Sequence, residues 1–268
     1  MAIQRSLPLC SLLLLLICPT ARAANVLILG DSLSANEPIG LASQVFEHLK
    51  SRHHVVAIGS CGSSPRWYQS DIRPITTPCG FLRKESDKAP KISARHVTPK
   101  LETLAQKDLD LAVIQQGTNL YGYLVGASKK TPAKAAQLIK SDVIKFLTEL
   151  AHRSPKSQCL WVAPPKIAKY DGHLVSDEAS QVMFESIQLA LEQFKNEKGY
   201  SCSIHDSRMD TTAPGGDGTH FSNSRQTMQW IKSVNEKVDR LLSSQRTANN
   251  SQEFLTEDEA SPPDRIHR

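Results

Sequence analysis

Short apolar runs alternate along this chain with longer stretches of helical periodicity. The apolar runs cover residues 25–30, 54–58, 109–116, 159–163 and 201–205 and are typical of strands buried on both faces. Between and after them, apolar positions three and four residues apart predict helices at residues 38–51, 94–106, 132–153, 177–197 and 222–242. This alternation predicts an α/β domain in which helices cover both faces of a parallel sheet.

One connection, residues 60–93, lacks this periodicity and contains four prolines. Connections this long within a compact domain are usually functional or disordered. We expect an ordered wall or lid over a site, with Arg66, Trp67 and Tyr68 facing a substrate. The alternative is that Trp67 and Tyr68 only pack the loop against the domain.

The two ends of the chain differ from the domain between them. Residues 1–23 combine an early arginine, an apolar run and Ala21-Arg22-Ala23, which is the pattern of a cleaved secretory signal. The run is too short to span a bilayer, so no integral membrane segment is expected after cleavage. Residues 243–268 are polar and predict a disordered tail. Residues 24–242 suit one domain, expected to be monomeric and secreted or periplasmic.

The charge balance changes this picture only slightly. Without the two arginines of the signal, the chain keeps 30 basic and 27 acidic residues, a net charge of +3. Such mild basicity fits association with an anionic envelope polymer. No basic stripe with interleaved aromatic residues is present, so no nucleic-acid partner is expected.

Cleavage of the signal leaves four cysteines, an even number that predicts two disulfides in an exported chain. Three pairings are possible. We favour Cys61–Cys79, which closes one loop, and Cys159–Cys202, which ties two strand regions together. A zinc site is not expected, because the chain has no Cys-x-x-Cys pair and the cysteines are widely spaced.

Ser32 stands where the first predicted strand ends and a helix begins. A serine hydroxyl becomes a nucleophile when a base takes its proton and an acid orients that base. Asp217 precedes His220 by three residues on a glycine-rich turn, so it can hold the imidazole in the tautomer that accepts this proton. The backbone of Ser32, a glycine after the second strand and the amide of Asn119 are candidate donors to an oxyanion. Asp31 is expected to order the turn.

Together these residues resemble the SGNH hydrolase superfamily, also called the GDSL family of esterases and lipases. Its first block matches Gly30-Asp31-Ser32-Leu33, and its last, Asp-x-x-His, matches Asp217-Gly218-Thr219-His220. The third block, usually Gly-x-Asn-Asp, becomes Gly117-Thr118-Asn119-Leu120, which keeps the glycine and asparagine and loses the aspartate. In the second block Gly62 fits the oxyanion glycine best, with Gly59 as the alternative.

The resemblance implies a flavodoxin-like three-layer αβα sandwich with a parallel sheet of about five strands in the order 2-1-3-4-5. It also implies an ester hydrolase with catalytic Ser32, His220 and Asp217, an oxyanion hole of Ser32, Gly62 and Asn119, and neither metal nor cofactor. Export, slight basicity and few aromatic residues favour O-acyl groups, such as acetyl, on an envelope or extracellular polysaccharide or peptidoglycan. The alternatives are a lipase or thioesterase of the same mechanism and a catalytically silent glycan-binding domain, which the lost aspartate would favour.

Overall fold

The five apolar runs form the parallel part of one sheet in the computed structural model, which describes residues 22–211 and 217–257. These strands are β1 (Asn25–Gly30), β2 (His54–Ser60), β5 (Leu111–Gln115), β6 (Gln158–Val162) and β9 (Cys202–His205). They lie in the order β2-β1-β5-β6-β9, and each neighbouring pair is parallel. The predicted fold class and its strand order 2-1-3-4-5 are therefore confirmed.

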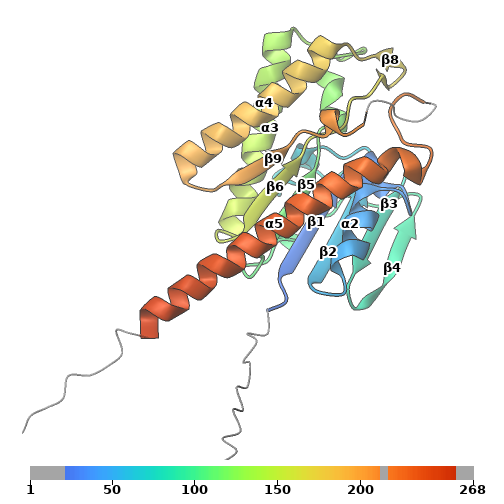
Figure 1. Cartoon of the computed structure of the whole chain (residues 1–268). Coiled ribbons are helices and arrows are strands. Elements are labelled where there is room, and N and C mark those ends of the chain that lie inside the picture. Colours follow the sequence, from blue (N-terminus) through green and yellow to red (C-terminus); the bar gives the residue numbers. More distant parts are fainter. Residues whose placement is uncertain (1–21, 212–216, 258–268) are drawn as a thin grey trace, which may run out of the picture.

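Helices cover both faces of the sheet (Figure 1). α3 (Pro132–Arg153) and α4 (Asp177–Lys198) pack on one face, and α2 (Leu41–Leu49) and α5 (Ser224–Glu257) pack on the other. Two apolar cores result, one on each face. Trp161 is fully buried in the first and Trp230 in the second. Because a large side chain moved out of water stabilises a fold by about 1.5–3 kcal/mol, these two layers hold the strands in place.

The ends of α3 and α4 follow from local chemistry. Thr131 caps α3 by accepting a hydrogen bond from the N–H of Lys134, and a proline occupies the first helical position. Ser176 caps α4 in the same way through the N–H of Ala179 (3.1 Å). α4 ends at Gly199, whose φ of 72° lies in the left-handed region that glycine adopts without strain.

A hairpin that the sequence did not predict extends the sheet beyond β2. β3 (Phe81–Glu85) pairs antiparallel with β2 and with β4 (Lys88–Ser93), so a third of the predicted wall, residues 60–93, is regular sheet. β4 is exposed along nearly its whole length, so it lacks the apolar alternation that marks a strand. The buried Lys84 anchors the hairpin by donating to Glu37 (2.8 Å) and Ser43 (2.7 Å).

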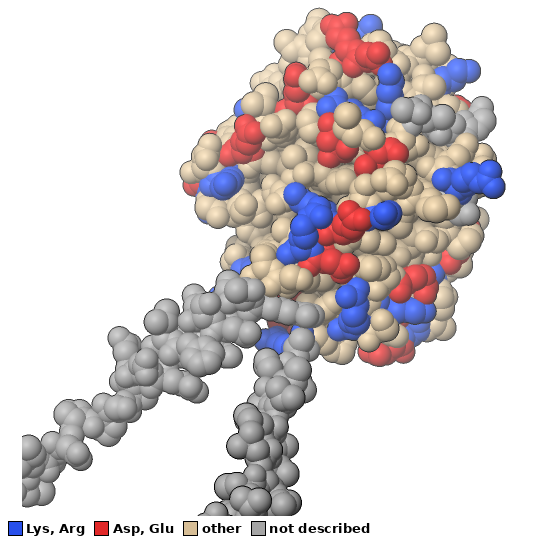
Figure 2. Space-filling view, viewed as in Figure 1, with Lys and Arg blue, Asp and Glu red and all other residues tan. Residues whose placement is uncertain are grey.

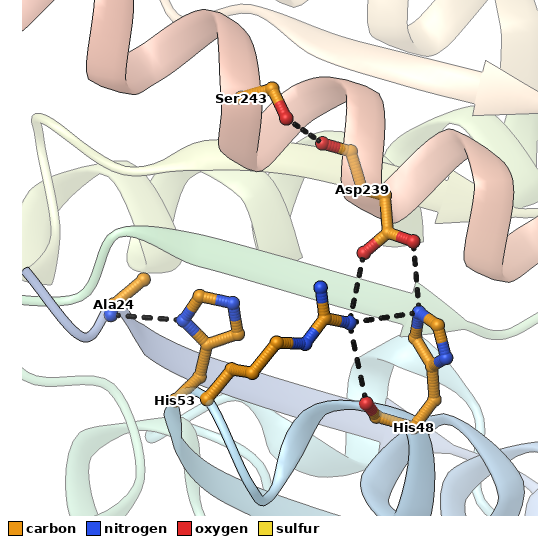
Figure 3. A network of polar contacts seen from close by, with 6 residues as sticks. Ala24, His48, His53, Asp239 and Ser243 are labelled. Carbon is orange, nitrogen blue, oxygen red and sulfur yellow. Dashed lines mark hydrogen bonds and ion pairs between the residues drawn. The ribbon is translucent and has the colours of Figure 1, made fainter. Parts of the chain in front are cut away.

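A polar network joins α2 to α5 on the outer side of the second core (Figure 3). The Asp239 carboxylate accepts from Arg52 (3.3 Å) and lies 2.9 Å from His48 Nε2. All three side chains are about one-third to one-half exposed, so each pair contributes at most about 1 kcal/mol. The network connects α5 to the end of α2, while the apolar core beneath it supplies most of the stability.

Two disulfides form, with the pairing that we favoured from the sequence. Cys61–Cys79 closes the loop after β2, with 5.4 Å between its Cα atoms. Cys159–Cys202 joins β6 to β9 at directly paired positions, with 4.3 Å between its Cα atoms. The two bridges therefore act on different parts of the molecule, one on a loop and one on the sheet.

Residues 94–106 do not form the predicted helix and contain only the short 3-10 turn η2 (Leu101–Thr103). The N–H of Thr98 donates to the carbonyl of Ile75 (2.8 Å), so this backbone pairs with the preceding loop. Pro99 also disfavours helical geometry at the residue before it. A tertiary contact therefore overrides the local periodicity.

The predicted disordered tail, residues 243–268, begins as a helix. α5 continues to Glu257, so residues 243–257 of this segment are helical in the structure. A helix that has already nucleated adds residues at little cost, and composition does not reveal this. Residues 258–268 lie outside the described part of the chain, as does the predicted signal except for Arg22 and Ala23.

Charged side chains of both signs are interspersed on the face that carries α5 (Figure 2). Among the described residues on that face, Lys and Arg form no continuous positive stripe of the kind that follows a phosphate backbone. Within residues 22–211 and 217–257, no helix is both long enough and apolar enough to cross a membrane.

Candidate active site

The carboxyl ends of three neighbouring strands bring the predicted residues to one edge of the sheet. Asp31 and Ser32 follow β1, Gly62 follows β2 by two residues, and Asn119 follows β5 by four. The strand order places β1 between β2 and β5. Ligands of open parallel sheets bind at such an edge, so these residues form the candidate site.

Asp31 ties the first of these loops to the third. Its side chain is fully buried; Oδ1 accepts from the N–H of Leu33 (3.0 Å) and Oδ2 from the N–H of Thr118 (3.1 Å). Burial raises the pKa of Asp31, and these hydrogen bonds oppose the shift. Because both oxygens are occupied by backbone donors, Asp31 orders the turn around Ser32, as the sequence predicts.

The two candidate oxyanion glycines have different surroundings. Gly59 lies against α1 (Ser32–Ala35), where a Cβ atom would come within 2.5 Å of the Ala35 Cα, so close packing requires its small size. Gly62 has a φ of +80°. Within the described residues its N–H has no hydrogen-bond acceptor, and neither does the N–H of Ser32. Gly62 therefore has a backbone donor free for a ligand.

Asn119 lies on the 3-10 turn η3 (Thr118–Tyr123), and both the nitrogen and the oxygen of its side-chain amide make hydrogen bonds. Nδ2 donates to the carbonyl of Ser63 (2.7 Å), and Oδ1 accepts from the hydroxyl of Tyr170 (3.4 Å). An amide nitrogen carries two hydrogens, so one N–H remains available to a ligand. The residue is half-buried and can reach a bound molecule.

Asp217 and His220 form the predicted pair. Oδ2 of Asp217 lies 2.6 Å from Nδ1 of His220, and Oδ1 accepts from the N–H groups of Thr219 (2.8 Å) and His220 (2.7 Å). Burial alone would raise the pKa of Asp217, but these hydrogen bonds outweigh it and lower the pKa to about 2. The ionised carboxylate assigns the hydrogen to Nδ1 of His220, which leaves Nε2 as an acceptor.

Ser32 and His220 line the same small pocket. Its other lining residues belong to α1, the segment before α2 and the residue after His220, namely Leu33, Asn36, Ile39, Gly40 and Phe221. Ser32 is 7% exposed and lies at this pocket. The pocket therefore brings together residues that lie almost 190 positions apart in the chain.

The three residues proposed to face substrate divide into two groups. Tyr68 is fully buried: its hydroxyl donates to the carbonyl of Gly30 (3.3 Å), and its ring packs edge-on against Phe146. For Tyr68 the alternative of loop packing therefore holds. Arg66 and Trp67 are half-buried on the 3-10 turn η1 (Pro65–Tyr68), with the guanidinium carbon 4.9 Å from the Trp67 ring centroid.

Tyr170 and the two-stranded hairpin that carries it were not predicted from the sequence. β7 (Lys169–Tyr170) and β8 (His173–Leu174) are joined by Asp171 and Gly172, whose φ angles are 48° and 77°. Asp-Gly is a strong signal for such a two-residue turn, and it could have located this hairpin. The strands are too short for an alternating pattern to reveal them.

The described residues contain no group of three or more His, Cys, Asp or Glu side chains arranged to hold a metal ion. The polar groups at this sheet edge are instead a hydroxyl, an imidazole–carboxylate pair and N–H donors. This set can transfer protons and stabilise an oxyanion.

Comparison with known proteins identifies the fold. No protein-family model and no curated protein matches the chain. Solved structures do match. Est24, a carbohydrate acetylesterase from Sinorhizobium meliloti, is 16% identical with a TM-score of 0.51, and the match covers 81% of this chain and 99% of that one.

Two further structures match the chain with the same TM-score. A carbohydrate esterase family 2 enzyme with a carbohydrate-binding domain, from Corynascus thermopiles, is 16% identical with a TM-score of 0.51 over 84% of this chain and 69% of that one. A protein from Agrobacterium tumefaciens that carries an arylesterase assignment is 17% identical with a TM-score of 0.51, over 81% and 99%. The chain thus has the α/β fold of these esterases, which is the fold that the SGNH resemblance predicts.

Proposed function

We propose that this chain is an exported serine ester hydrolase with Ser32 as nucleophile, His220 as general base and Asp217 as the orienting acid. The observation that carries the proposal is the pocket shared by Ser32 and His220, together with the 2.6 Å contact between Asp217 and the far nitrogen of the imidazole. The esterase fold and the SGNH motifs support the same reaction.

The proposed reaction is acyl transfer in two steps. Ser32 Oγ attacks the ester carbonyl while His220 Nε2 takes its proton, and Asp217 stabilises the imidazolium that forms. The N–H groups of Ser32 and Gly62 and the free N–H of Asn119 bind the oxyanion. His220 then protonates the leaving alcohol, and a water molecule activated by His220 hydrolyses the acyl-enzyme.

For the substrate we propose a small O-acyl group, such as acetyl, on an envelope or extracellular polysaccharide or peptidoglycan. The pocket that Ser32 shares with His220 is small, which disfavours a long acyl chain there. Arg66 and Trp67, on the turn that follows Gly62, are proposed contacts to the glycan. Two of the similar structures are named carbohydrate esterases. The two disulfides fit an oxidising compartment outside the cytosol.

Labelling with a fluorophosphonate tests the nucleophile, because this reagent phosphonylates an activated serine. We expect modification at Ser32 in the wild type, none in Ser32→Ala, and labelling slower by about 100-fold or more in His220→Ala. His152→Ala, which removes an exposed histidine at the end of α3, serves as the control and should be labelled at the wild-type rate. A folded wild-type protein that is not labelled would refute the enzyme and favour a silent glycan-binding domain.

Acyl-chain length tests the substrate class. With p-nitrophenyl esters, we expect kcat/KM to be highest for acetate and to fall steadily toward dodecanoate. Release of acetate from acetylated xylan or peptidoglycan, measured by chromatography, would identify the polymer. A preference for dodecanoate would instead indicate a lipid acyl hydrolase of the same mechanism.

A further inference from the structure

The β7–β8 hairpin lies between the two halves of the candidate site and contacts both. On one side, the Tyr170 hydroxyl donates to Oδ1 of Asn119 (3.4 Å). On the other, the N–H groups of Ala168 and Lys169 both donate to the carbonyl of Gly218 (2.8 and 3.0 Å). Gly218 belongs to the turn that carries Asp217 and His220. The hairpin therefore connects the amide donor to the proton-transfer pair.

The contact with the Asp217–His220 turn is close as well as hydrogen-bonded. The hydroxyl of Thr219 donates to the carbonyl of Lys169 (2.5 Å), which adds a third hydrogen bond between the two segments. Gly218 has a φ of +79°, and a Cβ atom there would come within 3.0 Å of the Lys169 side chain. Glycine is therefore favoured at this position, because a side chain there would be strained and tightly packed against β7.

Tyr170 is equally well placed on the η3 side. The residue is half-buried, and its ring lies against Gly122, where a Cβ atom would approach within 3.6 Å. Its centroid is 6.4 Å from that of Tyr121, which is fully buried. These contacts hold the phenol over η3, so the position of the hydroxyl is determined by packing and not only by its hydrogen bond.

The chemistry of the three groups specifies one orientation of the Asn119 amide. The carbonyl of Ser63 can only accept, so it meets Nδ2, and the Tyr170 hydroxyl then meets Oδ1 as a donor. Rotation of the amide by 180° would place Oδ1 against the Ser63 carbonyl, which is repulsive. In the observed orientation the second hydrogen on Nδ2 remains unpaired within the described residues.

We infer that Tyr170 is a positioning residue for the oxyanion donor Asn119, and that the β7–β8 hairpin holds this donor in register with the Asp217–His220 turn. This inference rests on the proposed hydrolase function. Tyr170 acts through Asn119 and does not itself touch the reacting atoms. Tyr170 orients the Asn119 N–H before the substrate binds. Its removal should therefore weaken stabilisation of the transition state and lower kcat.

The test is a pair of hydroxyl deletions measured alone and combined with loss of the amide. Tyr170→Phe keeps the ring and removes the hydrogen bond to Asn119. Tyr200→Phe is the matched control, because it removes a buried tyrosine hydroxyl that bonds to Ser157 (2.8 Å), a residue just before β6 and hence at the opposite edge of the sheet. Hydrolysis of p-nitrophenyl acetate gives kcat and KM, and thermal unfolding reports on stability.

Removal of an oxyanion donor outright lowers kcat by about 10²–10³-fold, so we expect Asn119→Ala to fall in that range. Tyr170→Phe should lower kcat by about 10-fold, because the donor remains but is less well held, with KM changed by less than about 2-fold. Tyr200→Phe should leave both unchanged. In the Asn119→Ala background, Tyr170→Phe should cause no further loss, because coupled residues are not additive.

Two results would overturn the inference while leaving the hydrolase intact. One is wild-type kcat in Tyr170→Phe. The other is an equal fall on removing the hydroxyl with and without Asn119, which would mean that Tyr170 acts by another route. A wild-type protein that neither hydrolyses the ester nor reacts with fluorophosphonate would overturn the proposed function, and the inference with it.

Discussion

At the scale of single residues, the Asp217 carboxylate carries the clearest electrostatic signal. It accepts three hydrogen bonds, and its pKa is lowered from 3.8 to about 2. A carboxyl with a depressed pKa stabilises the folded state above its unfolded pKa, and this contribution is lost as the pH falls through the folded pKa. Asp217 therefore contributes fully above about pH 4 and progressively less toward pH 2.

We predict that Asp217→Asn lowers the unfolding temperature by a constant amount between pH 5 and 7. The gap to the wild type should narrow below about pH 4 and nearly close at about pH 2, because the wild-type carboxyl is then about half protonated and has lost most of its contribution. Circular dichroism melts across this range would measure the gap. A gap that stays equally wide at pH 2 would show that the carboxylate charge does not contribute.

At the scale of elements, the two disulfides should have different roles, one mainly in stability and the other mainly in activity. Their sequence separations of 18 and 43 residues correspond to about 3 and about 4 kcal/mol of stabilisation in the chain-entropy description. Cys159–Cys202 joins two strands, whereas Cys61 directly precedes Gly62. Pro78, next to Cys79, lies against Gly62, where a Cβ atom would come within 2.8 Å of the proline ring. The loop bridge therefore supports the conformation of the proposed oxyanion glycine.

We predict a crossover between the two double variants. Cys159→Ala/Cys202→Ala should lose more stability in urea unfolding, by roughly 1 kcal/mol, because its loop is longer. Cys61→Ala/Cys79→Ala should lose more kcat on p-nitrophenyl acetate at a temperature where both variants remain folded. Equal losses of kcat would mean that the loop bridge has no special relation to Gly62.

At the scale of the whole molecule, the part of α5 up to Gln245 packs on the domain. Its buried apolar side chains extend to Leu242, and Gln245 makes a further contact by donating to the carbonyl of Asp110 (3.3 Å). We predict that a chain ending at Gln245 keeps its unfolding temperature within about 2 °C of the full chain's. A loss of about 1 kcal/mol of stability would lower it by at least that much. The matched truncation at Val234 removes the buried Val238 and Leu242 and should not fold stably. A large loss of stability in the longer chain would show that residues beyond Gln245 support the fold.

The sequence by itself determined the parallel core and the pairing of Asp217 with His220. Period and length are local properties, so they predict the five parallel strands and the helices at residues 132–153 and 177–197 to within a few residues. The Asp217–His220 contact spans only three residues along a glycine-rich turn, so its geometry is also local. The helix predicted at residues 94–106 had the same periodicity but does not form, because the backbone of Thr98 pairs with Ile75 instead.

Only the tertiary structure decided what depends on segments that are distant in the chain. The β3–β4 hairpin has no apolar alternation because β4 forms an exposed edge, and its strand character comes from pairing with β2. The close packing of Gly59 against Ala35 follows from the approach of α1 to β2, which no motif encodes. Tyr170 meets Asn119 across 51 residues, and such contacts arise from packing rather than from any periodic signal. The sequence thus specified the strands and the reactive pair, and packing specified the groups that hold them in place.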